Sequence, residues 1–420
     1  MNIEQLKNEH RLIDIFVQLA EIPSPSLKED MLATKIIEIF SIYDINAVQD
    51  HYGNIIAHIP AAVEDKDIPP LLLSAHMDVV GGSEDVNVRL SNCKRYIETD
   101  KTRTLGADDK FGIAAIIDLA IHLTSLYSEI KHGPIEITFT RDEESGMSGI
   151  RNLDTSKLNS QYAIIADGES LGELDVEGAG FTNVYVKVSG GKGGHSGINI
   201  QDKTRINAIN TLAEYISKIP QGVYKQNEKG VVTSINAGVI IGGTANTFLK
   251  ETSAYGKNIM NETAQKSLLN VIADEAYASF SIRSSEPANE KELINILKKA
   301  AKEINDQKRG FINIDLEIKS HLKPFVKSDD DLLPKIIIQS ARQCSIECSP
   351  SSFHAGAETH VFSNEKLNAH GQKFKPVIIG LANLKNIHSS DEKLDWKSFI
   401  EGRHLLEKIV INFAKHWKSS

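Results

Sequence analysis

Residues 71–80 read Leu-Leu-Leu-Ser-Ala-His-Met-Asp-Val-Val and lie between Pro69-Pro70 and Gly81-Gly82. A short apolar run that is bounded by turn residues predicts a buried strand. Side chains two residues apart on a strand point to the same face. His76 and Asp78 therefore share a face, where one can bind a metal ion while the other orients its imidazole. A His-x-Asp pair at a strand end also occurs by chance.

Strands and helices alternate on both sides of this run. Residues 4–21 and 27–43 have apolar spacing typical of amphipathic helices, whereas residues 111–123 are almost wholly apolar, as in a buried helix. Further strands are expected at residues 135–140 and 162–166. Strands that alternate with helices of this length predict an α/β fold with a mostly parallel sheet flanked by helices.

The pattern changes after about residue 178. The next segments predict a compact α+β unit in which two helices cover one face of a sheet, with strands near 184–188, 231–241, 276–283 and 312–318 and helices at 206–216 and 290–304. Buried segments return at 332–338 and 377–379, and a last helix starts at Trp396. We therefore expect a main domain of residues 1–178 and 323–420, with residues 179–322 as an inserted α+β domain.

Composition narrows the function classes. The chain has 420 residues and a net charge of -9, and this acidity argues against nucleic acid as a main partner. No stretch reaches the roughly 18 apolar residues that span a bilayer, so no membrane partner is expected. Residues 1–19 carry charges throughout and lack a signal-peptide core. Three cysteines form a sparse, odd set, which favours a cytoplasmic location.

Four more segments carry acidic or imidazole side chains. They are Gly106-Ala107-Asp108-Asp109-Lys110, Thr140-Arg141-Asp142-Glu143-Glu144-Ser145-Gly146, Asp167-Gly168-Glu169 and Asn386-Ile387-His388-Ser389-Ser390-Asp391-Glu392. An aspartate before a helix can bridge two cations or simply cap the helix. Two adjacent glutamates can divide the work, with one binding metal and the other accepting a proton from water.

Three of the five segments lie at the ends of predicted strands. His76, Glu143 and Asp167 lie at or just past strand ends, and ligands of α/β sheets gather at the carboxyl ends of strands. This convergence predicts a metal site. Carboxylate and imidazole ligands suit zinc, with manganese or cobalt as substitutes.

The ordered motifs resemble those of the co-catalytic zinc exopeptidases, a family that includes peptidase T, cytosolic dipeptidases, carboxypeptidase G and aminoacylases. The resemblance extends over the whole chain and implies two zinc ions bridged by Asp108. His76 and Asp167 would complete the first zinc site, and Glu144 and His388 the second. It also implies Glu143 as general base, Asp78 as the partner of His76, and a cis peptide between Asp108 and Asp109.

The inserted domain resembles the lid of that family. Gly193-Gly194-His195-Ser196-Gly197 matches a turn whose histidine stabilises the oxyanion across a homodimer, which implies a dimer formed through this domain. Asn246 and Arg283 match positions that bind the substrate's terminal carboxylate, for which a guanidinium is well suited. Each also has a plain structural alternative as a turn or surface residue.

The sequence indicates the class of substrate less clearly than it indicates the metal ligands. The Gly-Ala-Asp-Asp-Lys segment and the chain length resemble peptidase T, an aminotripeptidase, so we expect cleavage of short peptides. His354-Ala355-Gly356-Ala357-Glu358 favours the cytosolic dipeptidases instead, and His354 either shapes the substrate pocket or caps a helix. Hydrolysis of N-acyl amino acids is a third alternative. A metal-binding protein without catalysis is the competing class, since fold does not fix function.

Overall fold

The structure is a computed structural model that describes residues 2–62, 68–126, 128–228, 230–243 and 270–418. The chain forms two compact units. The first unit consists of Met1–Gly178, Phe325–Phe353 and Ala357–Ser420, and the second of Ala179–Pro324 and His354–Gly356. We propose 1–178 with 323–420, and 179–322, as the domains; the compact units differ from these bounds at residues 323–324 and 354–356, which group with the second unit.

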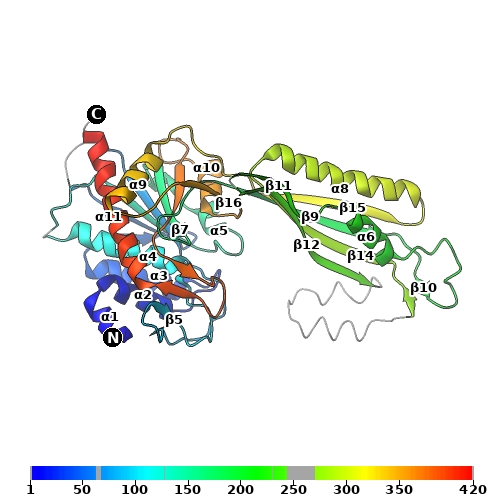
Figure 1. The fold of residues 1–420 in the computed structure, drawn as a ribbon, viewed down its shortest axis with the longest axis horizontal. Helices are drawn as coiled ribbons and strands as arrows, with labels where there is room; N and C mark the ends of the chain where they lie inside the picture. Colours follow the sequence, from blue (N-terminus) through cyan, green and yellow to red (C-terminus); the bar gives the residue numbers. More distant parts are fainter. Residues whose placement is uncertain (1, 63–67, 127, 229, 244–269, 419–420) are drawn as a thin grey trace. The chain divides into compact units, whose positions relative to one another are not determined.

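An eight-stranded sheet forms the centre of the first unit (Figure 1). Its strand order is β1-β2-β6-β3-β7-β17-β8-β16. The four middle strands run parallel, which confirms the expected mostly parallel sheet. Their bounds are β6 Ile135–Thr140, β3 Leu71–His76, β7 Tyr162–Gly168 and β17 Lys375–Gly380. The outer strands are β1 Ala47–Gln49, β2 Ile55–Ile59, β8 Leu174–Gly178 and β16 Pro350–Phe353.

Helices flank this sheet, and a small sheet completes the unit. The helices are α1 Ile3–Glu9, α2 Arg11–Glu21, α3 Asp30–Ile42, α4 Ala107–Thr124, α5 Ser148–Asn152, α9 Leu332–Gln343, α10 Glu358–Glu365 and α11 Trp396–Lys418. The small sheet has the order β18 (Leu384–Lys385), β19 (Lys393–Asp395), β5 (Tyr96–Glu98) and β4 (Arg89–Leu90). The single helix predicted over residues 4–21 is wrong, because His10 has extended backbone angles and separates α1 from α2.

Helix α4 shows how the sequence determines this packing. It is apolar around most of its circumference, and every residue from Lys110 to Ile121 is buried. A helix that is apolar all round must lie inside the domain. Accordingly α4 packs on β3 and β7, and α2 and α11 pack on α4. Truncating a large apolar residue in such a position typically costs about 2–5 kcal/mol, so this helix anchors the residues at its start.

The described residues of the second unit form an antiparallel sheet with two helices on it. The strand order is β11 (Gly222–Asn227), β12 (Gly230–Gly243), β14 (Glu275–Ser284), β9 (Gly180–Ser189) and β15 (Asn313–Leu322). Alternate residues of β9 and β14 are buried, and they form one core with α6 (Ala208–Ser217) and α8 (Pro287–Gln307). A separate two-stranded pair joins β10 (Gly194–His195) to β13 (Val271–Ile272). The expected α+β insert is therefore confirmed.

Candidate metal centre

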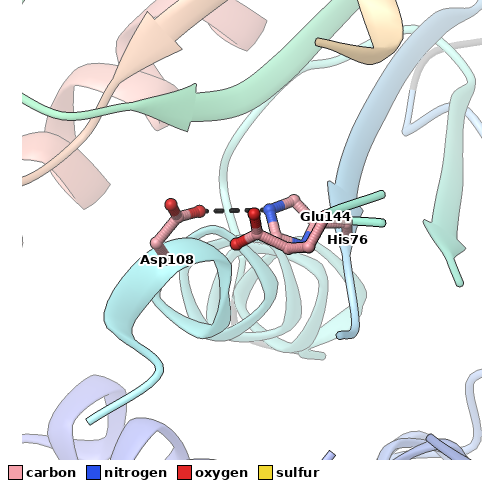
Figure 2. A group of neighbouring side chains, drawn as sticks. All are labelled: His76, Asp108 and Glu144. Carbon is pink, nitrogen blue, oxygen red and sulfur yellow. Dashed lines mark hydrogen bonds and ion pairs between the residues drawn. The ribbon is translucent and has the colours of Figure 1, made fainter. Parts of the chain in front are cut away.

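Parallel strands bring distant motifs together at the carboxyl ends of the central strands in the first unit's sheet. His76 is the last residue of β3, and Asp167 is the penultimate residue of β7. Glu143 and Glu144 follow β6 in a loop, while Asp108 lies in the first turn of α4. Figure 2 shows His76, Asp108 and Glu144 directed toward one another from three different elements.

The first group of candidate ligands surrounds the imidazole of His76. Its Nε2 lies 3.1 Å from Asp108 Oδ1 and 3.5 Å from Asp167 Oδ1. His76 is almost fully buried, and the two carboxylates are largely buried. Ligand atoms that share one tetrahedral metal at about 2.0–2.1 Å lie roughly 3.3 Å apart, so these separations suit one metal ion.

The second group surrounds the imidazole of His388. Its Nε2 lies 2.9 Å from Glu144 Oε1 and 3.2 Å from Asp108 Oδ2. The two oxygens of Asp108 therefore face different imidazoles, one from each group. This arrangement is what a carboxylate that bridges two cations requires. Among the described residues, no Lys or Arg forms an ion pair with Asp108, Glu144 or Asp167.

Asp78 supports both His76 and the loop of the two glutamates. The His76 Nδ1 lies 2.9 Å from the main-chain oxygen of Asp78 and 3.5 Å from its carboxylate. The same carboxylate accepts the backbone N–H groups of Glu143 and Glu144 at 2.8 and 3.1 Å. It also accepts the hydroxyl of Ser26 at 2.7 Å. Asp78 thus links His76 to the loop that carries Glu143 and Glu144.

The charges of the site shift its pKa values strongly. Burial, reinforced by the charge of Asp108, raises the pKa of Asp167 to about 8. Burial likewise raises the pKa of Glu143 well above its ordinary value, against the opposing effect of His76. Hydrogen bonds to Asp108 and Glu144 raise the pKa of His388 to about 10. A bound cation would lower the pKa values of these crowded carboxylates, because it favours their ionised form, which is the form that binds metal.

The sequence left open whether this segment supplies a metal ligand or a helix cap, and its two aspartates lie in positions that suit one role each. The carboxylate of Asp108 faces the imidazoles, whereas Asp109 Oδ1 accepts the N–H of Gly112 at 3.2 Å, as a helix cap does. Asp109 Oδ2 accepts the backbone N–H of His76 at 3.2 Å. The expected cis peptide between Asp108 and Asp109 is present.

Sequence reasoning missed the contacts that hold these segments together. Asp109 was considered only as a helix cap, and neither Ser26 nor Glu392 had an assigned role. Asp109 and Glu392 are buried carboxylates, and each accepts backbone N–H groups from a segment that carries a candidate ligand. The sequence shows that Asp109 and Glu392 stand beside ligand motifs, but it shows neither their burial nor their contacts.

The predicted residues of the second unit fall in two places: His195 lies on the β10–β13 pair, whereas His354 and Arg283 are neighbours, because both adjoin Ser234 of β12. His195 is exposed, and its Nδ1 accepts the N–H groups of Gly197 and Ile198 at 3.1 and 3.2 Å. Arg283 of β14 stacks its guanidinium 4.7 Å from the ring centroid of Phe181. His354 Nε2 lies 2.7 Å from Ser234 Oγ. Asn246 lies outside the described residues.

Comparison with known proteins places the chain in a class. The family model described as Peptidase family M20/M25/M40 matches residues 72–412. The chain is thus a metallopeptidase. It belongs to the M20/M25/M40 peptidase family, which includes dinuclear metal-binding peptidases.

Individual relatives cover different shares of the chain. The uncharacterized protein YqjE of Bacillus subtilis is 24% identical over 97% of this chain and 100% of its own. Peptidase T of Clostridium novyi is 34% identical over 41% of each chain. The crystal structure of a Staphylococcus aureus tripeptidase has a TM-score of 0.81 at 23% identity and covers 97% of this chain and 99% of its own. These matches support a metal-dependent exopeptidase that acts on short peptides.

Within the described ranges, no helix combines the length and the apolar character that crossing a bilayer requires.

Proposed function

We propose that the chain is an aminotripeptidase of the peptidase T kind, which binds two zinc ions and removes the first residue of short peptides. The observation that carries this proposal is the position of Asp108, whose two oxygens lie 3.1 and 3.2 Å from two different imidazoles. His76 and Asp167 would hold the first ion, and Glu144 and His388 the second, with Asp108 shared. Manganese or cobalt would suit the same ligands.

Glu143 is the proposed general base. It follows β6 beside Glu144, and burial raises its pKa well above its ordinary value. When bound, two zinc ions supply Lewis-acid activation of a water molecule and of the scissile carbonyl. Glu143 then takes the proton of the attacking water and returns it to the leaving amine. Asp78 keeps the Glu143 main chain in place through the 2.8 Å hydrogen bond to its N–H.

His195 is the proposed oxyanion donor. Two backbone N–H groups point at its Nδ1, so a neutral ring carries its proton on Nε2. That Nε2–H is then available to a developing negative charge on the substrate. We propose that His195 acts across a homodimer formed through the second unit, which size determination by light scattering would test.

Arg283, His354 and Asn246 are the proposed substrate-binding residues. The guanidinium of Arg283 has no carboxylate partner among the described residues, so it is available to the terminal carboxylate of a peptide. His354 is near enough to Arg283 for the guanidinium charge to lower its pKa, although burial is the larger cause. Asn246 stays a sequence-based proposal, as does the cytoplasmic location.

The test is hydrolysis of a matched panel after zinc addition, with products identified by mass spectrometry. The panel holds dipeptides, free tripeptides, a tripeptide blocked at its amino terminus and an acetylated amino acid. We expect the free tripeptides alone to be cleaved, with release of the first residue. Preference for dipeptides would establish the dipeptidase alternative. Activity on the acetylated amino acid alone would overturn the peptidase assignment in favour of the acyl-amino-acid alternative.

Metal content is the second test. We expect about two zinc ions per chain by elemental analysis, and loss of turnover when a chelator removes them. Restoring zinc should restore turnover. A chain that binds no zinc, yet hydrolyses tripeptides at the same rate, would remove the metal centre from the proposal.

A further inference from the structure

His388 lies in a loop whose two ends are fixed. Strands β18 and β19 pair on either side of it, with Leu384 opposite Leu394 and Lys385 opposite Lys393. Between them, His388 has a φ of 62° and its side chain is 47% exposed. The small sheet therefore holds the ends of the loop, while the imidazole itself extends toward Asp108 and Glu144 with little packing around it.

The same loop sends a second side chain inward. Glu392 is only 2% exposed and its Oε2 accepts the backbone N–H of Gly106 at 2.7 Å. Its Oε1 is 3.4 Å from the backbone N of Asp108. Gly106 is the N-cap residue of α4 and has no side chain that could cap the helix. Glu392 supplies this cap from a segment that lies 286 residues further along the chain.

Two residues of this short loop, His388 and Glu392, thus contact the same candidate ligand, Asp108. His388 approaches the Asp108 carboxylate at 3.2 Å, and four residues later Glu392 is hydrogen-bonded at the Asp108 main chain. A carboxylate at a helix start is also favoured by the helix dipole. Asp391, the neighbouring acid, forms an ion pair with Lys101 at 2.9 Å, and its other oxygen accepts the side-chain N–H of Asn386 at 3.2 Å.

We propose that Glu392 is a positioning residue that fixes the His388 imidazole relative to the Asp108 carboxylate, so that the second metal site is formed before metal arrives. The inference rests on the proposed two-metal centre. Groups that orient metal ligands from behind typically contribute about tenfold to a hundredfold to metal affinity. Without Glu392, the His388 loop and the start of α4 would be free to move separately.

The experiment is a cobalt titration of chelator-treated protein, followed by visible absorption. The variants are Glu392→Ala and the isosteric Glu392→Gln, which retains one acceptor oxygen. The matched control is Asp391→Asn, which removes a charge from the adjacent residue, and His388→Ala serves as the reference for a lost second site. Thermal unfolding of each protein without cobalt reports the purely structural effect.

We expect the parent chain to bind two equivalents of cobalt. Glu392→Ala should weaken the second equivalent by about tenfold to a hundredfold and change its absorption spectrum, with Glu392→Gln in between. Asp391→Asn should stay within about twofold of the parent, because exposed ion pairs contribute little.

Two results would overturn the inference, and they are distinguishable. If both Glu392 variants bind the second equivalent as the parent does, while only their Tm falls, Glu392 is a helix cap and no more. If the parent itself binds fewer than two equivalents, the proposed centre fails and takes the inference with it. The Gln variant keeps the test decisive should Glu392→Ala fail to fold.

Discussion

The candidate metal centre of the first unit and the His195 turn of the second unit hold their side chains in different ways. In the first unit, carboxylates from other segments fix the candidate ligands: Asp78 accepts N–H groups of the glutamate loop, and Asp109 accepts that of His76. His195 is exposed, and within the described part of the chain its ring is held only by the N–H groups of its own turn.

This difference predicts that metal binding and turnover depend on different parts of the molecule. Buried carboxylates that accept backbone N–H groups hold the ligand segments in place before any ligand arrives. A histidine held by a local turn presents its free nitrogen to solvent and needs another surface to complete a site. We therefore expect metal binding to depend on the first unit alone, and turnover to depend on both.

The largest effect is expected from Asp108→Asn. The amide is a poor bridging ligand, so both groups of ligands lose a shared anionic oxygen at once. We expect the metal content to fall from about two ions to one or none, and kcat/KM to fall by at least about 10⁴-fold. Elemental analysis and tripeptide hydrolysis measure the two effects. As a control, Asp391→Asn removes an exposed carboxylate of the His388 loop and should leave both unchanged; unaltered metal content in Asp108→Asn would contradict the bridging role.

A smaller loss is expected from Glu143→Gln. The variant keeps the shape of the side chain but cannot accept a proton, and general-base catalysis typically contributes about 10²–10⁴-fold. Because Glu143 is not a proposed ligand, both metal ions should remain bound. The measurement is kcat with metal content on the same sample. Full activity of Glu143→Gln with its metals in place would exclude this base, whereas loss of metal would reassign Glu143 as a ligand.

The fold and the ligand motifs could be predicted because each depends on local sequence. The apolar run of residues 71–80 forms β3, although the strand ends at His76, four residues earlier than predicted. The almost wholly apolar segment 111–123 lies within α4, as predicted. Supporting contacts could not be predicted in this way. Glu392 and Gly106 are 286 residues apart, and nothing in either segment alone shows that a carboxylate of one caps the helix of the other. The break at His10 was missed because a single extended residue hardly disturbs an apolar helical spacing.

The substitution His195→Ala tests whether the second unit contributes to turnover without contributing to metal binding. Removing one oxyanion donor typically lowers kcat by about 10²–10³-fold, and a side chain outside the first unit should leave metal affinity unchanged. Steady-state kinetics and a cobalt titration separate the two quantities. The control is Asn199→Ala, which removes only the 3.0 Å acceptor of the His195 backbone N–H and should cost far less. A parental kcat in His195→Ala would take this residue out of the mechanism.

The smallest effect is expected from Arg283→Lys, in substrate binding alone. Lysine keeps the positive charge but lacks the planar pair of donors that matches a carboxylate, and a hydrogen bond to a charged group contributes about 1.5–3 kcal/mol. Losing part of it should raise KM for free tripeptides by about tenfold, with kcat little changed. A tripeptide amide, which has no terminal carboxylate, should bind parent and variant equally. Arg309→Lys, a substitution of the same type elsewhere in the second unit, should leave KM unchanged. If the amide and the free acid lose binding to the same extent, Arg283 supports the fold around Phe181, and the carboxylate must be recognised by another group.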